Sequence, residues 1–125
     1  MTTVHEPENT SGSLIAASKV NGTAVYNQGG EKLGSVYDVM LGKQSGKAEY
    51  AIMSFGGFLG IGDRYSPLPW HALSYDTGLG GFVVNLDRSQ LEGGPSYSQT
   101  EMLKWDTDTT WGRGVRDYYD PMLPH

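Results

Sequence analysis

Short runs rich in valine, tyrosine, isoleucine and phenylalanine alternate with turn-forming clusters between residues 20 and 86. This spacing is typical of an all-β sandwich or barrel. We expect strands at residues 23–26, 32–42, 47–55, 72–76 and 82–86. The last two form a closing hairpin across the turn 77–81. Prolines at positions 67 and 69 restrict the segment 64–70 to an edge strand or a break.

The strand expected at residues 32–42 has apolar side chains on both faces. One face carries Val36, Asp38 and Met40, and the other carries Tyr37, Val39 and Leu41. Such two-sided apolarity predicts a strand that bends around a small barrel, with Gly34 and Gly42 as candidates for a kink or bulge. The next strand, 47–55, is expected to be the most buried, since Tyr50 and Ile52 oppose Ala51 and Met53.

The pattern changes after residue 86. The segment 87–95, DRSQLEGGP, predicts one helical turn that ends at glycines and a proline. Ser98 and Glu101 stand at capping-box spacing, which predicts the start of a short helix. We therefore expect a disordered arm over residues 1–12, a barrel domain over 13–92 and a C-terminal tail with short helical segments over 93–125.

The tail is unusually aromatic. Trp111, Val115, Tyr118 and Tyr119 fall on one helical face, although Gly112 and Gly114 each weaken a helix by about 1 kcal/mol. Large aromatic side chains are unfavourable in water. We expect the tail to dock on the barrel or on a neighbouring subunit through Trp105, Trp111, Tyr118 and Tyr119.

Composition and charge narrow the range of functions. The net charge is −5 and the nine basic residues are spread along the chain, which disfavours direct binding to nucleic acid or to an anionic membrane. The chain has 0 cysteines, which excludes disulfides, a thiolate nucleophile and a cysteine-ligated metal. It begins without the features of a signal peptide and contains no run of 18 apolar residues, so we expect a soluble cytoplasmic protein without membrane insertion.

Motifs for catalysis or ligand binding are weak. The segment 42–48, GKQSGKA, resembles a phosphate-binding loop, but its glycines are one residue too close and Ala48 replaces the hydroxyl residue, so a hairpin turn is favoured. His5, His71 and His125 form no pair at ligand spacing, and we expect no metal or cofactor. An acid/base pair stays open among the separated carboxylates, although solvated side chains are favoured. These carboxylates are Asp38, Glu49, Asp63 and Asp76.

The segment 56–62 is an apolar loop rich in glycine. It carries Phe58, Leu59 and Ile61 among four glycines, which permit backbone angles that other residues resist. The loop either presents these side chains to a partner or folds back to plug one end of the barrel. Tyr65, Trp70 and Tyr75 are candidates for the barrel mouth, where they would surround a small ligand if the protein were a ligand-binding barrel rather than an interaction module.

Several motifs in this order resemble the PRC-barrel family. The matching features are the turn 30–34 with Asp38 beyond it, the hairpin 45–46, the strand 50–55, and residues 69–70 with 72–73. The resemblance extends from residue 13 to residue 92. It implies the small β-barrel shared by the cytoplasmic domain of the photosynthetic reaction-centre H subunit and the C-terminal domain of a ribosome maturation factor. The tail patterns at 111–113 and 117–119 are similar to those of small stand-alone bacterial members.

The resemblance implies a docking module rather than an enzyme. We therefore expect a non-catalytic interaction or scaffold module that forms a homodimer or higher oligomer and binds an unidentified protein partner. A small-ligand-binding regulatory barrel, a ribosome- or RNA-processing-associated factor and a weak hydrolase are the alternatives. Ligand-dependent melting shifts would favour the first, and a salt-dependent RNA affinity would favour the second.

Overall fold

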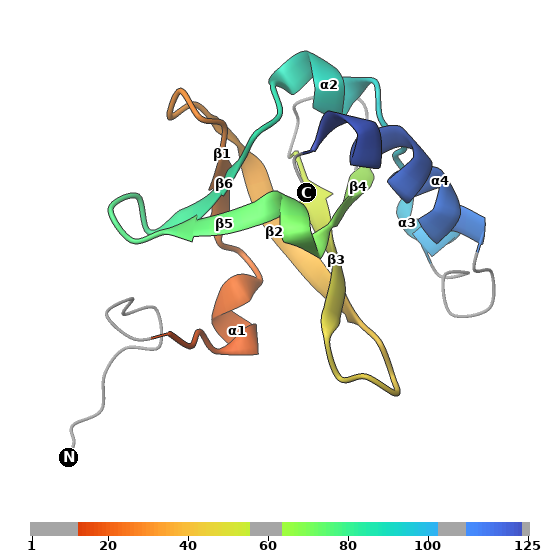
Figure 1. Cartoon of the computed structure of the whole chain (residues 1–125), viewed down its shortest axis with the longest axis horizontal. Helices are drawn as coiled ribbons and strands as arrows, with labels where there is room; N and C mark the ends of the chain where they lie inside the picture. Colours follow the sequence, from red (N-terminus) through yellow and green to blue (C-terminus); the bar gives the residue numbers. More distant parts are fainter. Residues whose placement is uncertain (1–12, 56–63, 103–109, 124–125) are drawn as a thin grey trace.

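The computed structural model describes residues 13–55, 64–102 and 110–123 (Figure 1). All the strands expected from the sequence are present. The strands are β1 (Ala24–Tyr26), β2 (Lys32–Leu41), β3 (Ala48–Ser54), β4 (Tyr65–Pro69), β5 (Leu73–Asp76) and β6 (Gly81–Val84). The helices are α1 (Ala17–Val20), α2 (Arg88–Glu92), α3 (Gln99–Met102) and α4 (Thr110–Tyr119), with 3-10 turns η1 (Trp70–Ala72) and η2 (Asp120–Met122).

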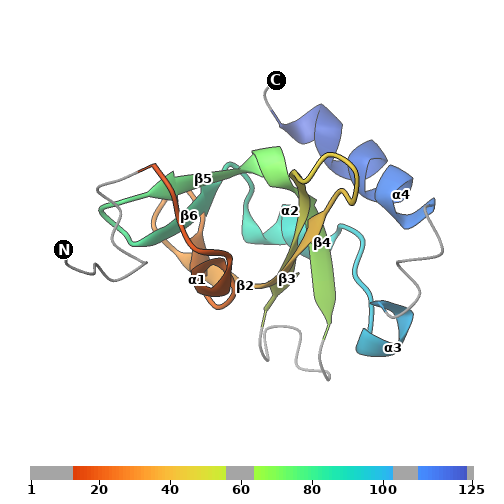
Figure 2. The same ribbon diagram turned by 90° about the horizontal axis from the view of Figure 1, so that it is seen from below.

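The strands form one sheet in the order β4-β3-β2-β1-β6-β5. Neighbouring strands are antiparallel except for β1 and β6, which run parallel with Val25 beside Phe82. The sheet curls, so that the β5–β6 hairpin and the β3–β4 pair lie on two sides of the molecule (Figure 2). The expected barrel is therefore confirmed as a curled half-barrel of six strands.

The two edges of the sheet, β4 and β5, are joined by η1. Of the two alternatives predicted for the proline-containing segment, the structure shows the edge strand. All five residues of β4 are buried, whereas β3 has exposed and partly buried residues at its ends, so the prediction that 47–55 is the most buried strand is wrong. The outer side of β4 is covered at its start, because the backbone N–H groups and carbonyls of Tyr65 and Tyr97 exchange two hydrogen bonds of 2.8 and 2.9 Å. Proline lacks a backbone donor, so the remaining edge offers few groups for pairing with another strand.

Strand β2 departs from the strict alternation predicted for it. Its pairing with β3 shifts register between Val36 and Asp38, because Tyr37 is an extra, bulged residue. Val36 is buried whereas Asp38 is exposed, so the prediction that these two residues share a face is wrong. A further shift, in the pairing with β1, falls beside Gly34, one of the two predicted positions. At Gly34 the backbone passes so close to the Ser54 carbonyl that a β-carbon would clash.

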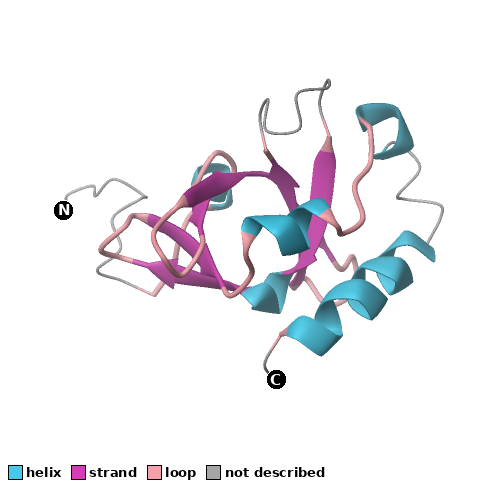
Figure 3. Cartoon of the chain, turned by 90° about the horizontal axis from the view of Figure 1, so that it is seen from above, coloured by secondary structure: helices cyan, strands magenta, loops and turns pink. Residues whose placement is uncertain are grey.

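One hydrophobic core joins the sheet and the C-terminal tail. Val115 and Tyr119 of α4 are fully buried, and Leu123 is buried beside the strand residues. Helix α4 lies along the β4 side of the sheet (Figure 3). The short helix predicted after residue 98 is present, since the Glu101 N–H donates to Ser98 Oγ at 3.2 Å and the Ser98 N–H donates to Glu101 Oε1 at 2.8 Å. The helical turn predicted after residue 86 corresponds to α2.

Candidate functional site

An apolar groove with a volume of about 360 Å³ opens between α1, the second half of β2 and η1. In Figure 1, α1 and the tip of the β2–β3 hairpin project from the same side of the molecule. The residues that line the groove are Ile15, Ala17, Val20, Asn21, Asp38, Val39, Leu41, Ala48 and Trp70. Seven of these nine side chains are apolar. Such a groove can receive an apolar side chain of a partner.

Two local features build the groove. On one side, Val20 is buried and the chain after α1 is held against β2, because the Gly22 N–H donates to the Val36 carbonyl at 2.7 Å and the Val36 N–H donates to the Thr23 carbonyl at 2.9 Å. On the other side, the pairing of β2 with β3 shifts register at Tyr37 and again between Met40 and Leu41. Leu41, which follows the second shift, is 61% exposed at the groove.

The three aromatic residues predicted at the barrel mouth do not form one cluster. The Trp70 and Tyr75 rings both pack edge-on against Phe82, with ring centroids 5.7 and 5.2 Å away. Trp70 also lines the groove. Tyr65 begins β4, at the opposite end of the strand from Trp70, and is buried with its ring centroid 4.4 Å from that of Tyr37.

The tail residues predicted to dock lie against the barrel of the same chain. The Trp111 ring is 4.9 Å from the ring of Tyr50 on β3. The Tyr118 hydroxyl donates to the Gln90 carbonyl at 2.8 Å, which links α4 to α2. Tyr119 is fully buried, and this burial raises the pKa of its phenol above the usual value. Trp105 lies outside the described residues.

Tyr50 is the contact point of α4 on β3. Its hydroxyl donates to the Gly112 carbonyl at 3.3 Å and accepts a hydrogen bond from the guanidinium of Arg116. Burial raises the pKa of Tyr50, and the nearby Arg116 charge partly offsets this effect. These contacts serve to hold the helix in place.

The apolar side chains of the glycine-rich loop, Phe58, Leu59 and Ile61, lie outside the described residues. The groove residues Ile15, Val39 and Leu41 were not singled out as a site by sequence reasoning. The available signal was the second apolar face of the strand at 32–42. In the sequence, barrel curvature explains that face, because the bulge in β2 depends on its pairing with β3 and leaves no signal in a linear pattern.

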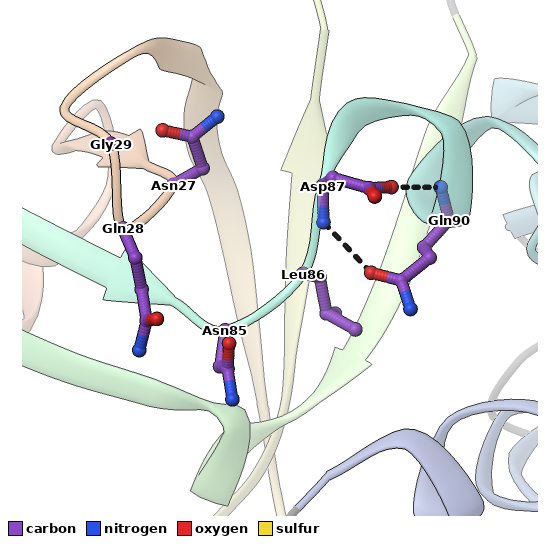
Figure 4. A pocket seen from close by; sticks show the side chains of 7 residues that line it. All are labelled: Asn27, Gln28, Gly29, Asn85, Leu86, Asp87 and Gln90. Atoms are coloured by element: carbon purple, nitrogen blue, oxygen red, sulfur yellow. Dashed lines mark hydrogen bonds between the residues drawn. The ribbon is translucent and has the colours of Figure 1, made fainter.

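A polar pocket of about 260 Å³ lies at the carboxyl ends of β1 and β6 (Figure 4). Parallel strands end at the same edge of a sheet, so the loops that follow these two strands meet there. The residues that line the pocket are Asn27, Gln28, Gly29, Asn85, Leu86, Asp87 and Gln90.

Three of the polar side chains in this pocket stabilise local structure. Asp87 caps α2: its carboxylate accepts from the Gln90 N–H at 2.8 Å, and the Gln90 side chain accepts from the Asp87 N–H at 2.8 Å. The backbone bond from Gln90, followed by the Ser89 hydroxyl, lowers the pKa of Asp87 below its usual range. Asn27 bonds the backbone and side chain of Glu31 across the β1–β2 turn. The pocket is therefore largely a consequence of capping and turn formation.

In the described part of the chain, no three His, Asp or Glu side chains are grouped so that they could hold a metal ion. No helix in these segments has the length and apolar character needed to cross a membrane.

The curled six-strand sheet with a docked helical tail defines a small β-barrel protein. The PRC-barrel domain model matches residues 13–91, and the chain belongs to the PRC-barrel family. Among solved structures, a putative 16S ribosomal RNA processing protein, RimM, from Pseudomonas aeruginosa is similar over 59% of this chain and 44% of its own, with 22% identity and a TM-score of 0.39. No curated protein matches the chain.

Proposed function

We propose that this PRC-barrel protein is a non-catalytic interaction or scaffold module that binds a protein partner in the apolar groove. The observation that carries this proposal is the exposure of Leu41 beside the partly buried Val39 and Trp70. Covering a leucine side chain completely is worth about 1.5–3 kcal/mol, so a partner that fills the groove gains binding free energy there. Apolar surface collected in a concave site is typical of interaction sites.

The perturbed ionisable groups support a role other than catalysis. Among the described residues with a shifted pKa, Tyr50 and Tyr119 are packed between the sheet and α4, and Asp87 caps α2. Perturbed groups at active sites face a cleft in which a substrate can bind. The apolar groove contains none of these three side chains, and Asp87, which lines the polar pocket, has its carboxylate engaged in capping α2.

Affinity capture with matched variants tests the groove. The full chain is immobilised, and proteins retained from the native cell are compared for the wild type, Leu41→Ser and the control Leu79→Ser. Leu79 is also exposed, at 44%, but lies in the β5–β6 turn away from the groove. A partner retained by the wild type and the control but lost with Leu41→Ser supports the proposal. Retention that is identical for all three proteins contradicts it.

The proposal includes self-association and a cytoplasmic location, both expected from the sequence. Self-association would use the apolar loop side chains Phe58, Leu59 and Ile61. Light scattering tests the oligomer, and cell fractionation tests the location.

A further inference from the structure

We infer that the groove selects partner segments in which a large apolar side chain lies within a few residues of a lysine or arginine. This inference rests on the proposed function, because it specifies which partner the groove accepts. It is carried by Asp38, which lines the groove together with seven apolar side chains and Asn21. Of the described residues that line it, Asp38 alone carries a charge.

The carboxylate of Asp38 has unused acceptor capacity. Asp38 Oδ1 accepts a hydrogen bond from the backbone N–H of the next residue, Val39, at 2.8 Å. Within the described segments, no cationic side chain forms an ion pair with Asp38, and its side chain is exposed. A carboxylate has about four acceptor positions, so a donor from a partner can be accommodated.

Desolvation makes this carboxylate selective. A purely apolar partner that filled the groove would remove water from Asp38 without replacing it, which is strongly unfavourable for a charged group. A partner that also brings a lysine or arginine replaces the lost hydration with a charge-assisted hydrogen bond. The net charge of −5 also favours the approach of a cationic segment. The lysines of the neighbouring segments, Lys19, Lys32, Lys43 and Lys47, do not line the groove.

A selection with charge reversal tests the inference. The full chain and the Asp38→Lys variant are each used to select from a phage library of random 12-residue peptides. The sequence most enriched by the wild type is then synthesised, together with a version in which its basic residue is replaced by glutamate. Fluorescence anisotropy measures the binding of both peptides to the wild type, Asp38→Asn, Leu41→Ser and the control Asp117→Asn. Asp117 is an exposed aspartate on α4, outside the groove.

We expect the wild type to enrich an apolar residue next to lysine or arginine, and Asp38→Lys to enrich the same apolar residue next to glutamate or aspartate. Asp38→Asn should weaken binding of the basic peptide by about three- to tenfold, Leu41→Ser should weaken both peptides, and Asp117→Asn should change neither. Circular dichroism and melting of each variant confirm that it is folded.

Other outcomes separate this inference from the proposed function. If Leu41→Ser abolishes binding but the charge preference is the same for the wild type and Asp38→Lys, the charge inference is wrong and the groove proposal stands. If no peptide is enriched, or Leu41→Ser changes nothing, both are wrong. If sedimentation shows a dimer that Leu41→Ser dissociates, a second copy occupies the groove and the inference is overturned.

Discussion

Replacing Gly112 with alanine tests how α4 is held against the sheet. Gly112 is buried on the helix face that meets Tyr50. A β-carbon added there would lie 2.9 Å from the Tyr50 hydroxyl oxygen and 3.5 Å from the ring carbon that carries it. Gly114, in the same helix, is exposed, and a β-carbon added there would meet nothing within 4 Å. The two glycines therefore form a matched pair.

The two substitutions are expected to change the free energy of unfolding in opposite directions. Alanine is favoured over glycine inside a helix by about 1 kcal/mol, and this gain applies at both positions. At Gly112 the added methyl group displaces the buried Tyr50, for which overpacking costs about 1–3 kcal/mol, and weakens a hydrogen bond worth about 0.5–1.5 kcal/mol. We expect Gly112→Ala to destabilise the protein by about 1–2 kcal/mol and Gly114→Ala to stabilise it by about 0.5–1 kcal/mol.

Thermal melting followed by circular dichroism measures both variants. For a chain of this size the expected changes are a fall in Tm of roughly 3–8 °C for Gly112→Ala and a rise of roughly 2–4 °C for Gly114→Ala. Gly112→Ala should also change the fluorescence of Trp111, whose ring packs on Tyr50. If both variants raise Tm equally, α4 does not contact Tyr50 as described and the reasoning is refuted.

Three further predictions concern other parts of the chain. Truncation after Gly94 removes the buried side chains of Val115, Tyr119 and Leu123 and should cost several kcal/mol of stability, so melting like that of the full chain would show that the tail contributes nothing. Phe58→Ser with Leu59→Ser should dissociate an oligomer without unfolding the barrel, whereas an unchanged mass with a collapsed Tm would identify the loop as a barrel plug. Asp87→Ala should lower Tm at neutral pH. Because hydrogen bonds lower the folded-state pKa of Asp87 below 3.8, this difference should be lost only as pH falls through that lowered value.

The candidate site was less predictable than the fold. Trp70 was singled out from the sequence, and the structure places it at the groove. Its predicted neighbours Tyr65 and Tyr75 lie elsewhere. Tyr65 is at the start of β4, whereas Trp70 follows the end of that strand, and Tyr75 packs on Phe82. Residues from α1, β2, β3 and η1 meet in the groove, and no local pattern encodes which of them will be neighbours.

The sequence by itself determined the strands, the edge position of the proline-containing segment and the capping box at Ser98, because each depends on residues close together along the chain. Only the tertiary structure decided where α4 packs, that β1 and β6 run parallel, and that Asp38 is exposed at an apolar groove. These features depend on contacts between distant segments. The bulge at Tyr37 is the clearest example: it breaks the alternation between the buried Val36 and the exposed Asp38, and its position is set by the pairing of β2 with β3.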